Sequence, residues 1–583
     1  MKRTITDNVA AARRILRGET ATPEEIFDLS TALKKENEFG YSRKLLGRAL
    51  DDATIHAKPA LQLKISQEYA LCTYKDADLP VLARLNRALV ILDRADLLVG
   101  TKNQETLGLA GAIWKRKWEV ENQKTNLERS LSYYHRGYRF GIDNDNGYTA
   151  INAAFVLDCL AALEMSEALH AGTTSATAAA RVNEAKTIRR EIVASLEKQL
   201  AANPALGSQW WFVVTVAQAY FGLADFAKAS EWLMKATALD SVEEWQYEST
   251  ARQFAQLASL QEQLTGGALD AVAEAWQTLS QFLGNNAAAL RTLDIGKFGL
   301  ALSGGGFRAS LFHIGMLARL AELDLLRHVE VISCVSGGSI IGAHYYLELR
   351  RLLESKADRD ITQQDYVELV QRVERDFLAG VQRNIRMRVA ADWLANVKML
   401  FVPHYSRTQR VGELFEKEIF ARVQGNTPDK PIWLNELFIQ PKDAPPNFHP
   451  KYHNWKREAK VPMLILNATA LNSGHTWQFT ASWMGEPPME IDEEIDSNKR
   501  LRRMYYHEAP EKYRRFRLGH AVAASACVPG LFEPLALPNL YEDVTVRLVD
   551  GGVHDNQGTG SLKEQDCTVM VVSDASGQMD YQE

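Results

Sequence analysis

The sequence predicts two domains of different class, an all-α N-terminal half and an α/β C-terminal half. The chain has 583 residues, more than a single hydrophobic core usually supports. Before about residue 290 almost every segment spaces its apolar residues as a helix does, and after it short apolar runs alternate with helical patterns. We therefore expect a helical domain at residues 1–285, a linker at 286–298 and an α/β domain at 299–583.

Composition and charge argue against several classes of protein. Apolar residues make up 46% of the chain and charged residues 24%, which is an ordinary globular composition rather than a disordered one. The net charge of −6, with no long basic stretch, argues against nucleic-acid binding. Five scattered cysteines form no CxxC pair, so neither a disulfide framework nor a zinc site is predicted. We expect no metal, no cofactor and a reducing, cytoplasmic location.

Paired helices with small residues at their contact points are predicted in the N-terminal half. The clearest unit is residues 211–239, and looser units cover 105–140 and 41–50. Small and large apolar residues of the first unit have the spacing of a tetratricopeptide repeat, namely Ala217, Tyr220, Phe226, Ala229, Leu233 and Ala236. The small residues let two helices approach, and the large ones fill the space between them. An ordinary bundle of amphipathic helices is the alternative.

Three segments of this half allow a more specific comparison with a known family, namely residues 105–118, 133–138 and 148–154. Together they resemble the tetratricopeptide-like regulatory module, or TRAFs-binding domain, of apoptosis signal-regulating kinases, over roughly residues 30–265. The resemblance implies a sensing or interaction domain whose ligand is a protein or a small molecule. It also implies that this half supplies no catalytic residue.

A glycine turn follows the first predicted strand of the C-terminal half. Residues 298–303 are predicted as a buried strand, residues 304–306 are all glycine, and residues 310–323 have helical spacing. Such a turn presents backbone N–H groups at a helix N-terminus, where they suit either an oxyanion or the phosphates of a dinucleotide. The dinucleotide interpretation lacks the acidic residue expected at the end of the next strand. A tight turn without chemistry is the third interpretation.

A serine lies on the next predicted strand-to-helix turn, in the motif Cys-Val-Ser-Gly-Gly at 334–338. A sharp turn of this kind exposes the hydroxyl above the sheet and requires small residues two positions before and after the serine. Gly338 meets this requirement, whereas Cys334 replaces the usual glycine and departs from the pattern. We predict Ser336 as a nucleophile, with the Gly337 N–H as one donor of an oxyanion hole.

The candidate base is an aspartate at the end of a late apolar strand. Asp550 is followed by Gly551 and Gly552, which let another segment approach its carboxylate. A serine needs such a base to become nucleophilic, and no histidine has a motif context that selects it for this role. Taken alone, the motif favours an ordinary Asp-Gly turn.

The three motifs together resemble the patatin-like phospholipases. Gly-Gly-Gly-Phe-Arg, Val-Ser-Gly-Gly and Asp-Gly-Gly occur in the family's order, and residues 524–534 and 467–474 resemble two further segments. The resemblance implies a three-layer α/β fold and a dyad without histidine, with Ser336 as nucleophile and Asp550 as general base. It assigns the oxyanion loop to consecutive glycines, namely Gly304, Gly305 and Gly306. Arg308 would brace this loop or contact a substrate phosphate.

This resemblance implies a serine lipid acyl hydrolase of phospholipase A or lysophospholipase type, regulated by the helical half. The substrate would be a membrane phospholipid or lysophospholipid, and a bacterial defence effector fits the pairing of domains by analogy. The alternative is an interaction scaffold whose patatin-like domain is inactive, and the departure at Cys334 is its best support.

Two basic and aromatic segments, 498–506 and 512–517, suggest how such an enzyme would reach a lipid. Contact with anionic headgroups is one interpretation, and a solvated face balanced by the acidic stretch 490–496 is the other. Because no secretory signal and no run of 18 apolar residues occurs, we expect peripheral contact at the inner face of the membrane. The apolar stretch 399–403 is either part of a lid or, as we favour, a core segment.

Overall fold

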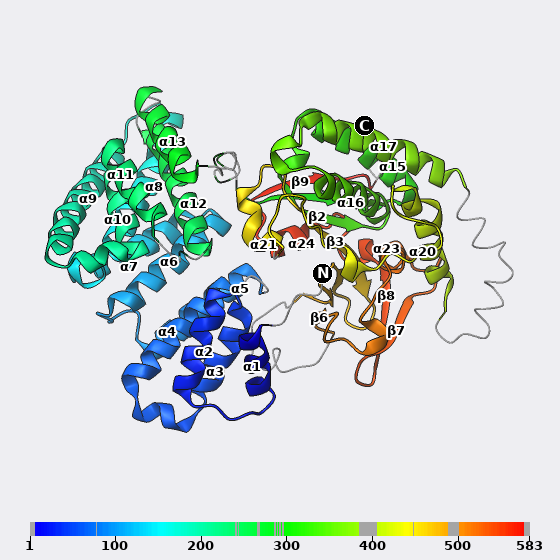
Figure 1. Ribbon diagram of the computed structural model, residues 1–583, viewed down its shortest axis with the longest axis horizontal. Helices are drawn as coiled ribbons and strands as arrows, with labels where there is room; N and C mark the ends of the chain where they lie inside the picture. Colours follow the sequence, from blue (N-terminus) through cyan, green and yellow to red (C-terminus); the bar gives the residue numbers. More distant parts are fainter. Residues whose placement is uncertain are drawn as a thin grey trace. The chain divides into compact units, whose positions relative to one another are not determined.

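The computed structural model divides the chain into a helical unit, Lys2–Asp294, and an α/β unit, Ile295–Glu583 (Figure 1). The structure describes all residues except 1–5, 77–78, 240–241, 243, 265–268, 285–286, 288–289, 291–292, 294–295, 384–404, 447, 488–500 and 577–583. The division falls within the segment 286–298, which the sequence analysis assigns to a linker. Both predicted fold classes, all-α followed by α/β, are confirmed.

The helical unit is built from successive helices that pack as antiparallel neighbours. Its described helices are α1 (Asp7–Leu16), α2 (Pro23–Lys35), α3 (Phe39–Leu50), α4 (Pro59–Lys75), α5 (Val81–Ala95), α6 (Gln104–Glu121), α7 (Lys124–Tyr138), α8 (Tyr148–His170), α9 (Ala176–Ala202), α10 (Trp210–Gly222), α11 (Phe226–Thr237), α12 (Glu244–Leu264) and α13 (Leu269–Leu283). Helices α6 with α7, α8 with α9 and α10 with α11 form close pairs, as repeated helical hairpins require.

Glycines set the spacing between α6, α7 and α8. A Cβ atom on Gly111 would lie 2.8 Å from the ring of Tyr134, so only glycine fits beneath that ring. The Ser130 hydroxyl donates a hydrogen bond to the Gly111 carbonyl at 2.8 Å, which ties α7 to α6. On the other side of α7, a Cβ atom on Gly137 would lie 2.5 Å from Thr149 of α8. These small residues therefore let three consecutive helices approach closely.

The pair α10–α11 corrects one detail of the predicted repeat. Phe226 and Leu233 are buried between the helices, as the spacing predicts. Tyr220 is only partly buried, and its hydroxyl donates to Glu197 of α9 at 2.6 Å instead of lying between the paired helices. A tyrosine hydroxyl needs a polar partner when its ring is partly buried, and the neighbouring helix supplies one.

Helix α8 is the one helix in the described part of the chain that is long and apolar enough to cross a membrane. Within the helical unit, however, 83% of its apolar window is buried by neighbouring helices. Its most deeply buried carboxylate, Asp158, pairs with Arg189 of α9 at 2.5 Å. Because a buried charge requires such a partner, the pair accounts for an aspartate on an otherwise apolar helix.

The α/β unit contains a nine-stranded mixed sheet among its described residues. Its elements are β1 (Phe298–Leu302), α15 (Gly306–Glu322), β2 (Val329–Val335), α16 (Gly337–Ser355), α17 (Gln363–Val381), α20 (Arg407–Glu418), α21 (Pro450–His453), β3 (Met463–Ala470), β4 (Thr476–Phe479), β5 (Trp483–Gly485), β6 (Met504–Tyr505), α23 (Leu518–Ser525), β7 (Leu535–Tyr541), β8 (Val544–Asp550), α24 (Thr559–Glu564) and β9 (Val569–Ser573). The strand order is β6-β5-β4-β3-β2-β1-β9, and the hairpin β7–β8 joins it through β8 and β3.

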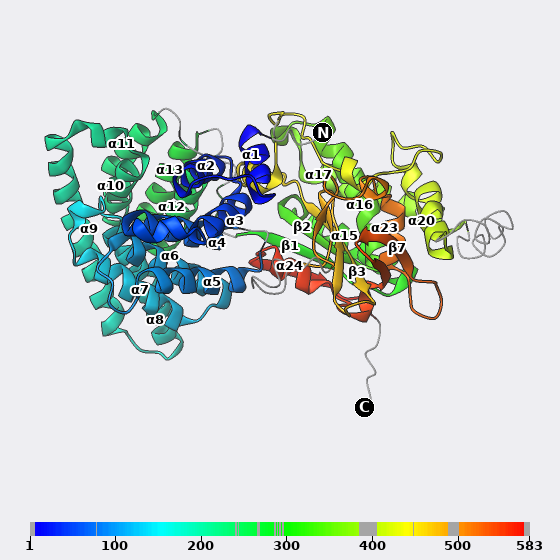
Figure 2. The same ribbon diagram turned by 90° about the horizontal axis from the view of Figure 1, so that it is seen from below.

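Helices cover both faces of the parallel part of this sheet (Figure 2). Leu300 and Ile332 face the main core, to which α15, α16 and α17 contribute. Ala301 and Val331, one residue along each strand, face Leu562 of the short helix α24. Successive side chains of a strand point to opposite faces, so this alternation produces a helix–sheet–helix arrangement. The second helical layer is thin, because α24 has only six residues.

One edge of β3 is shared by two strands that end facing each other. Along this edge β2 runs parallel to β3 and ends with Val335 opposite Asn467. The next residue of β3, Ala468, is opposite Asp550, the last residue of the antiparallel strand β8. Ala468 also pairs with Trp477 of β4, so β8 must lie on the edge of β3 away from β4, which is the edge that β2 uses. The register therefore brings the end of β2 next to the end of β8.

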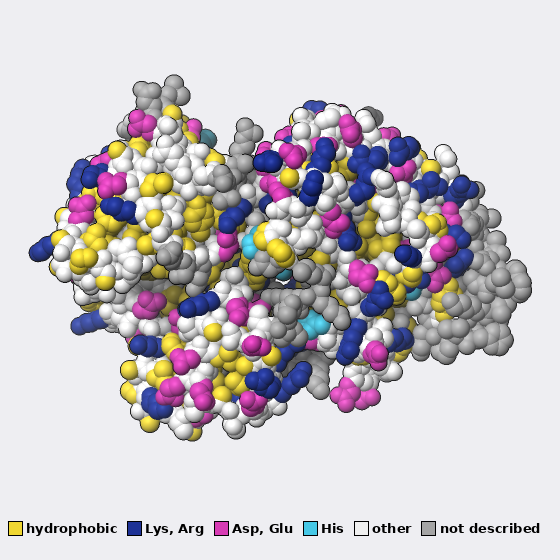
Figure 3. Space-filling view, viewed as in Figure 1, with side chains coloured by type: hydrophobic (Ala, Val, Ile, Leu, Met, Phe, Trp, Pro, Cys, Tyr) yellow, Lys and Arg dark blue, Asp and Glu magenta, His cyan; other side chains and the backbone are white. Residues whose placement is uncertain are grey.

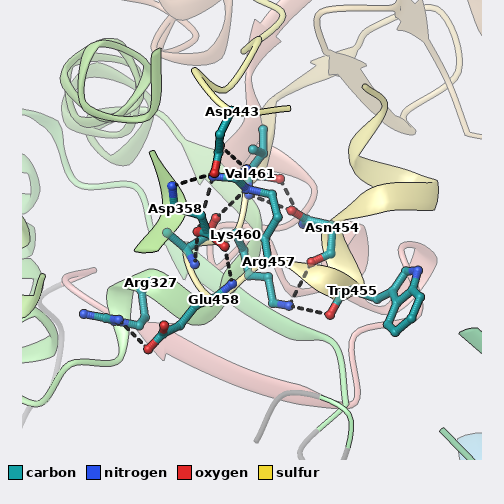
Figure 4. Close-up of polar contacts among 10 residues, drawn as sticks. Arg327, Asp358, Asp443, Asn454, Trp455, Arg457, Glu458, Lys460 and Val461 are labelled. Carbon is teal, nitrogen blue, oxygen red and sulfur yellow. Dashed lines mark hydrogen bonds and ion pairs between the residues drawn. The ribbon is translucent and has the colours of Figure 1, made fainter. Parts of the chain in front are cut away.

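A partly buried polar network holds the segment that leads into β3 (Figure 4). Asp358 accepts hydrogen bonds from the backbone N–H groups of Glu458 and Ala459, at 2.9 and 2.8 Å, and pairs with Arg457 at 3.3 Å. Arg327, two residues before β2, pairs with Glu458 at 2.8 Å. The network joins the start of β2 to the segment before β3, and this supports the register between the two strands.

Candidate active site

Ser336 lies at the end of β2 on a strained strand-to-helix turn. Its backbone angles, φ 50° and ψ −115°, fall in a region that residues with a side chain rarely adopt. Its backbone N–H donates to the hydroxyl of Ser525 at 3.0 Å, which holds the turn in place. Only 5% of the residue is exposed, so the hydroxyl is positioned inside the unit rather than in bulk water. This is the local geometry of a nucleophile elbow.

The two glycines after Ser336 allow α16 to begin against β1 and the glycine turn. A Cβ atom on Gly337 would lie 2.0 Å from the Gly306 carbonyl oxygen. A Cβ atom on Gly338 would lie 2.2 Å from the carbonyl oxygen of Leu302. Neither position has room for a side chain, so the close approach of the elbow to the glycine turn depends on these residue types.

The unusual Cys334 is accommodated by a glycine on α16. The residue is fully buried, and a Cβ atom on Gly342 would lie 2.3 Å from its sulfur. The usual glycine at position 334 would leave space between the strand and α16. Here the glycine is at position 342 of α16, and the Cys334 side chain occupies the space that it leaves. Burial also raises the pKa of the Cys334 thiol, so the sulfur remains a neutral packing group. The departure at this position does not distort the elbow.

Asp550 is placed beside Ser336 by the register of β8 on β3. Its own N–H donates to the Cys527 carbonyl at 2.8 Å, and its carboxylate accepts the N–H of Gly552 at 2.8 Å. Burial raises the pKa of Asp550, and hydrogen bonds from Gly552 and from the Ser336 side chain lower it in part. A carboxylate with a raised pKa is a better proton acceptor than an ordinary one. The pair therefore has the chemistry of a nucleophile and its general base.

A serine and an asparagine that the sequence analysis did not select support this pair. The Ser525 hydroxyl accepts from the Ser336 N–H, lies 2.7 Å from the Ser339 hydroxyl and donates to the Asn467 carbonyl at 2.5 Å. The Asn467 amide donates to the hydroxyl of Ser333 on β2 at 2.9 Å. The sequence signal that could have identified these two residues is their polar character within otherwise apolar segments. Both stabilise the strand ends at which Ser336 and Asp550 lie.

The glycine turn leaves fewer backbone N–H groups without an acceptor than the predicted oxyanion hole requires. The N–H of Gly304 donates to the Asn556 carbonyl at 3.0 Å, so its assignment as an oxyanion donor is wrong. No described residue accepts a hydrogen bond from the N–H of Gly305, Gly306 or Gly337. Gly305 and Gly306 have φ values of 139° and 67°. Residues with a side chain rarely adopt such positive values, so the orientation of these peptide groups depends on glycine. These three N–H groups are the available donors.

A buried histidine holds the base of the glycine turn. His313 Nε2 lies 2.9 Å from the Ser303 carbonyl oxygen, and its Nδ1 lies 2.7 Å from the Ser573 hydroxyl. Because a carbonyl only accepts, Nε2 carries the proton and Nδ1 accepts from Ser573. Gly338 N–H donates to the same carbonyl at 3.1 Å, which connects the glycine turn to the elbow. Burial lowers the pKa of His313, consistent with a neutral ring.

Arg308 does not brace the glycine turn. Its side chain is exposed on the first turn of α15 and pairs with no side chain in the described part of the chain. The other predicted role, contact with a substrate phosphate, is compatible with this position. Exposure also leaves the guanidinium accessible to a charged headgroup.

The basic segments predicted to contact a membrane are largely engaged elsewhere. Within 512–517, Arg517 pairs with the buried Glu416, and Arg515 pairs with Glu436 at 2.5 Å. Part of the segment 498–506, its acidic counterpart 490–496 and the apolar stretch 399–403 lie outside the described residues. Arg515 and Arg517 are therefore balanced by Glu436 and Glu416, whereas the balance by the stretch 490–496 that the alternative names stays a prediction.

Comparisons with known proteins agree with this architecture. The family model described as patatin-like phospholipase matches residues 300–562, and the one described as Tetratricopeptide Repeats-Sensor matches residues 40–157. The comparison with curated proteins gives no match. One solved structure, a tetratricopeptide repeat protein from Parabacteroides merdae ATCC 43184, is 15% identical over 45% of this chain and 99% of that chain. Its TM-score of 0.18 is too low to support an argument about the fold.

The two matched ranges lie in different units, and each agrees with the elements observed there. The match at 300–562 includes the glycine turn, the elbow and Asp550, and the match at 40–157 includes the glycine-spaced helices α6 and α7. The chain thus combines a tetratricopeptide-repeat sensor domain with a domain of the patatin-like phospholipase family, which is a lipid hydrolase.

Proposed function

We propose that the protein is a serine lipid acyl hydrolase of phospholipase A or lysophospholipase type, with Ser336 as nucleophile and Asp550 as general base. The observation that supports this proposal is the position of Ser336 and Asp550 side by side at the point where β2 and β8 meet, where the Ser336 side chain lowers the pKa of the Asp550 carboxyl in part. The strained elbow and the N–H groups of the glycine turn beside it supply the other two parts that acyl transfer requires.

The reaction proceeds in two steps. Asp550 accepts the Ser336 proton as the serine oxygen attacks the ester carbonyl, and the resulting oxyanion is bound by the N–H groups of Gly305, Gly306 and Gly337. The lysolipid alcohol leaves with the proton from Asp550, and the acyl group stays on the serine. Water then attacks the acyl-enzyme with Asp550 as base, which releases a fatty acid and restores the serine. Each lost oxyanion donor typically costs about a hundred- to a thousandfold in rate.

The helical unit acts as the regulatory part of this enzyme. Support comes from the sensor-domain match and from the position of the whole candidate site in the α/β unit. A protein or small-molecule ligand of the helical unit would set the activity, and a defence effector that degrades membranes on a signal fits this arrangement. We place the enzyme in the cytoplasm, in peripheral contact with the inner face of the membrane.

An inactive domain used as an interaction scaffold is the second candidate function. Its best support was Cys334 in place of the elbow glycine, and the space left by Gly342 removes the steric reason for that concern. The raised pKa of Asp550 also favours the enzyme, because an ionisable group kept buried beside a serine costs stability without serving packing.

Replacing either dyad residue is expected to abolish fatty-acid release from mixed phospholipid vesicles. Ser336→Ala removes the nucleophile, and Asp550→Asn removes a base whose contribution is typically about a hundred- to ten-thousandfold. Ser355→Ala, at the far end of α16, is the matched control and should retain the wild-type rate. Equal rates for wild type and both dyad variants would contradict the proposal and favour the scaffold.

The acid limb of the pH profile is expected at a higher pH than an ordinary aspartate produces, because burial raises the pKa of Asp550. Only the ionised carboxylate acts as a base, so kcat/KM falls as the pH drops through the raised value. The measurement is kcat/KM for a water-soluble ester across the acid range. A limb at or below about 3.9, the pKa of an ordinary aspartate, would show that Asp550 is not the titrating base.

The raised pKa of Asp550 also predicts how stability depends on pH. Protonation of Asp550 should lower the activity but stabilise the fold. A raised native-state pKa means that the protonated form stabilises the fold and that this contribution is lost as the pH rises through the native value. Asp550→Asn resembles the protonated form, so its Tm should equal or exceed that of wild type at neutral pH. The difference in Tm between Asp550→Asn and wild type should shrink in acid. A lower Tm for Asp550→Asn than for wild type at neutral pH would contradict this prediction.

Gly342→Ala is expected to damage the elbow, because the new methyl group would lie 2.3 Å from the sulfur of Cys334. Overpacking of this kind costs about 1–3 kcal/mol, so both Tm and esterase activity should fall. Adding Cys334→Gly removes the sulfur and should restore both. Gly315→Ala, on α15 with nothing within 4 Å of its Cβ position, is the control. A fully active, stable Gly342→Ala protein would refute the conclusion that Gly342 makes room for Cys334.

A further inference from the structure

An exposed apolar turn lies directly beside Asp550. Residues 528–532, with the sequence Val-Pro-Gly-Leu-Phe, join α23 to β7. Leu531 exposes 71% of its surface, and Val528 is also exposed. Cys527, the residue before the turn, accepts the backbone N–H of Asp550 through its carbonyl at 2.8 Å. The turn is therefore attached to the strand end that carries the catalytic base.

Hydrogen bonds keep this turn closed and its apolar tip in solvent. The N–H groups of Leu531 and Phe532 both donate to the Val528 carbonyl, at 3.1 and 3.2 Å. At its base the Cys527 thiol donates to the Glu533 carbonyl at 3.1 Å. A turn held in this way presents its leucine without a further ordering cost when a partner binds.

Other exposed apolar residues flank the remaining parts of the site. Leu311 and Phe312 follow the glycine turn on α15, and Val553 follows Asp550 by three residues. Phe312 and Val553 each expose 56% of their surface. Apolar side chains reach the surface in patches on both units (Figure 3), so exposure alone marks no site. These residues differ because each lies next to a catalytic component, and with Val528 and Leu531 they form what we call the apolar rim.

The segment after Asp550 connects the members of the apolar rim in space. The Asn556 carbonyl accepts the N–H of Gly304, so the segment that begins at Val553 borders the glycine turn. Asp550 is bonded in turn to Cys527, next to the 528–532 turn. Segments that carry exposed apolar residues therefore border both the glycine turn and the strand end at Asp550.

We infer that the apolar rim, led by the 528–532 turn, is the surface with which the protein docks on a phospholipid bilayer. The inference rests on the proposed function, since a dyad that cleaves membrane lipids must meet them at its own entrance. Exposed Arg308, one turn before Leu311 and Phe312 on α15, offers a cation that matches the phosphate of a headgroup. Docking thus involves residues near the dyad, in place of the basic segment 512–517.

Vesicle binding tests this surface without hydrolysis if the nucleophile is removed. In a Ser336→Ala background, Leu531→Ser is expected to weaken co-sedimentation with vesicles of phosphatidylcholine and phosphatidylglycerol by about tenfold or more. Leu323→Ser is the matched control, because Leu323 is also an exposed leucine but lies at the opposite end of α15. Tm values for both variants verify that they are folded. Unchanged binding by the folded Leu531→Ser variant overturns the inference, whether or not the wild type hydrolyses lipid.

A fluorescent label placed at position 531 reports insertion directly. All five native cysteines are buried, and burial raises the pKa of each thiol, so the surface thiol of Leu531→Cys would react selectively. An environment-sensitive label there should shift to the blue with vesicles, whereas one attached through Leu323→Cys should not. Equal responses at the two positions would overturn the inference. A shift that appears with protein concentration alone would assign the turn to a protein partner and overturn it as well.

Discussion

The structure of the site depends on one edge of β3 being shared by two strands. Strand β2 uses the first part of this edge and stops at Val335, opposite Asn467, and β8 arrives from the other direction and stops at Asp550, opposite Ala468. The residue that follows β2 and the residue that ends β8 are therefore neighbours, although they are 214 positions apart in the chain. Backbone hydrogen bonds of the sheet, which are among the least variable parts of a fold, place the serine and the carboxylate together.

This placement has two local costs, and the surrounding residues offset both. The first is the strained backbone of Ser336, which is held by the Ser525 hydroxyl and by glycines that let α16 begin against the glycine turn. The second is the burial of Asp550, which raises its pKa and makes its ionised form unfavourable for stability. Both features suit catalysis, because a sharp strand-to-helix turn directs the serine hydroxyl out of the sheet and a poorly solvated carboxylate is a stronger base.

The sequence predicted the parts of the site that short motifs encode. The glycine turn, Ser336 and Asp550 each follow a run of apolar residues, so strand ends and their order were visible without a structure. Three features were not predictable, because they depend on contacts between distant segments. The Asn556 carbonyl accepts the Gly304 N–H, Gly342 makes room for Cys334, and the Ser525 hydroxyl accepts the Ser336 N–H. In the helical unit the position of Tyr220 was not predictable for the same reason, because its partner Glu197 lies on a different helix pair.

The central claim is that Ser336 is made nucleophilic by Asp550, and a serine-directed phosphonate tests it most directly. After reaction of the protein with a fluorophosphonate, the modified peptide is located by mass spectrometry and the rate of modification is compared with that of Asp550→Asn. The account predicts a single adduct on Ser336 in the wild type and a strongly slowed reaction in the variant. An adduct on another serine, or an equal rate without the carboxylate, would contradict it.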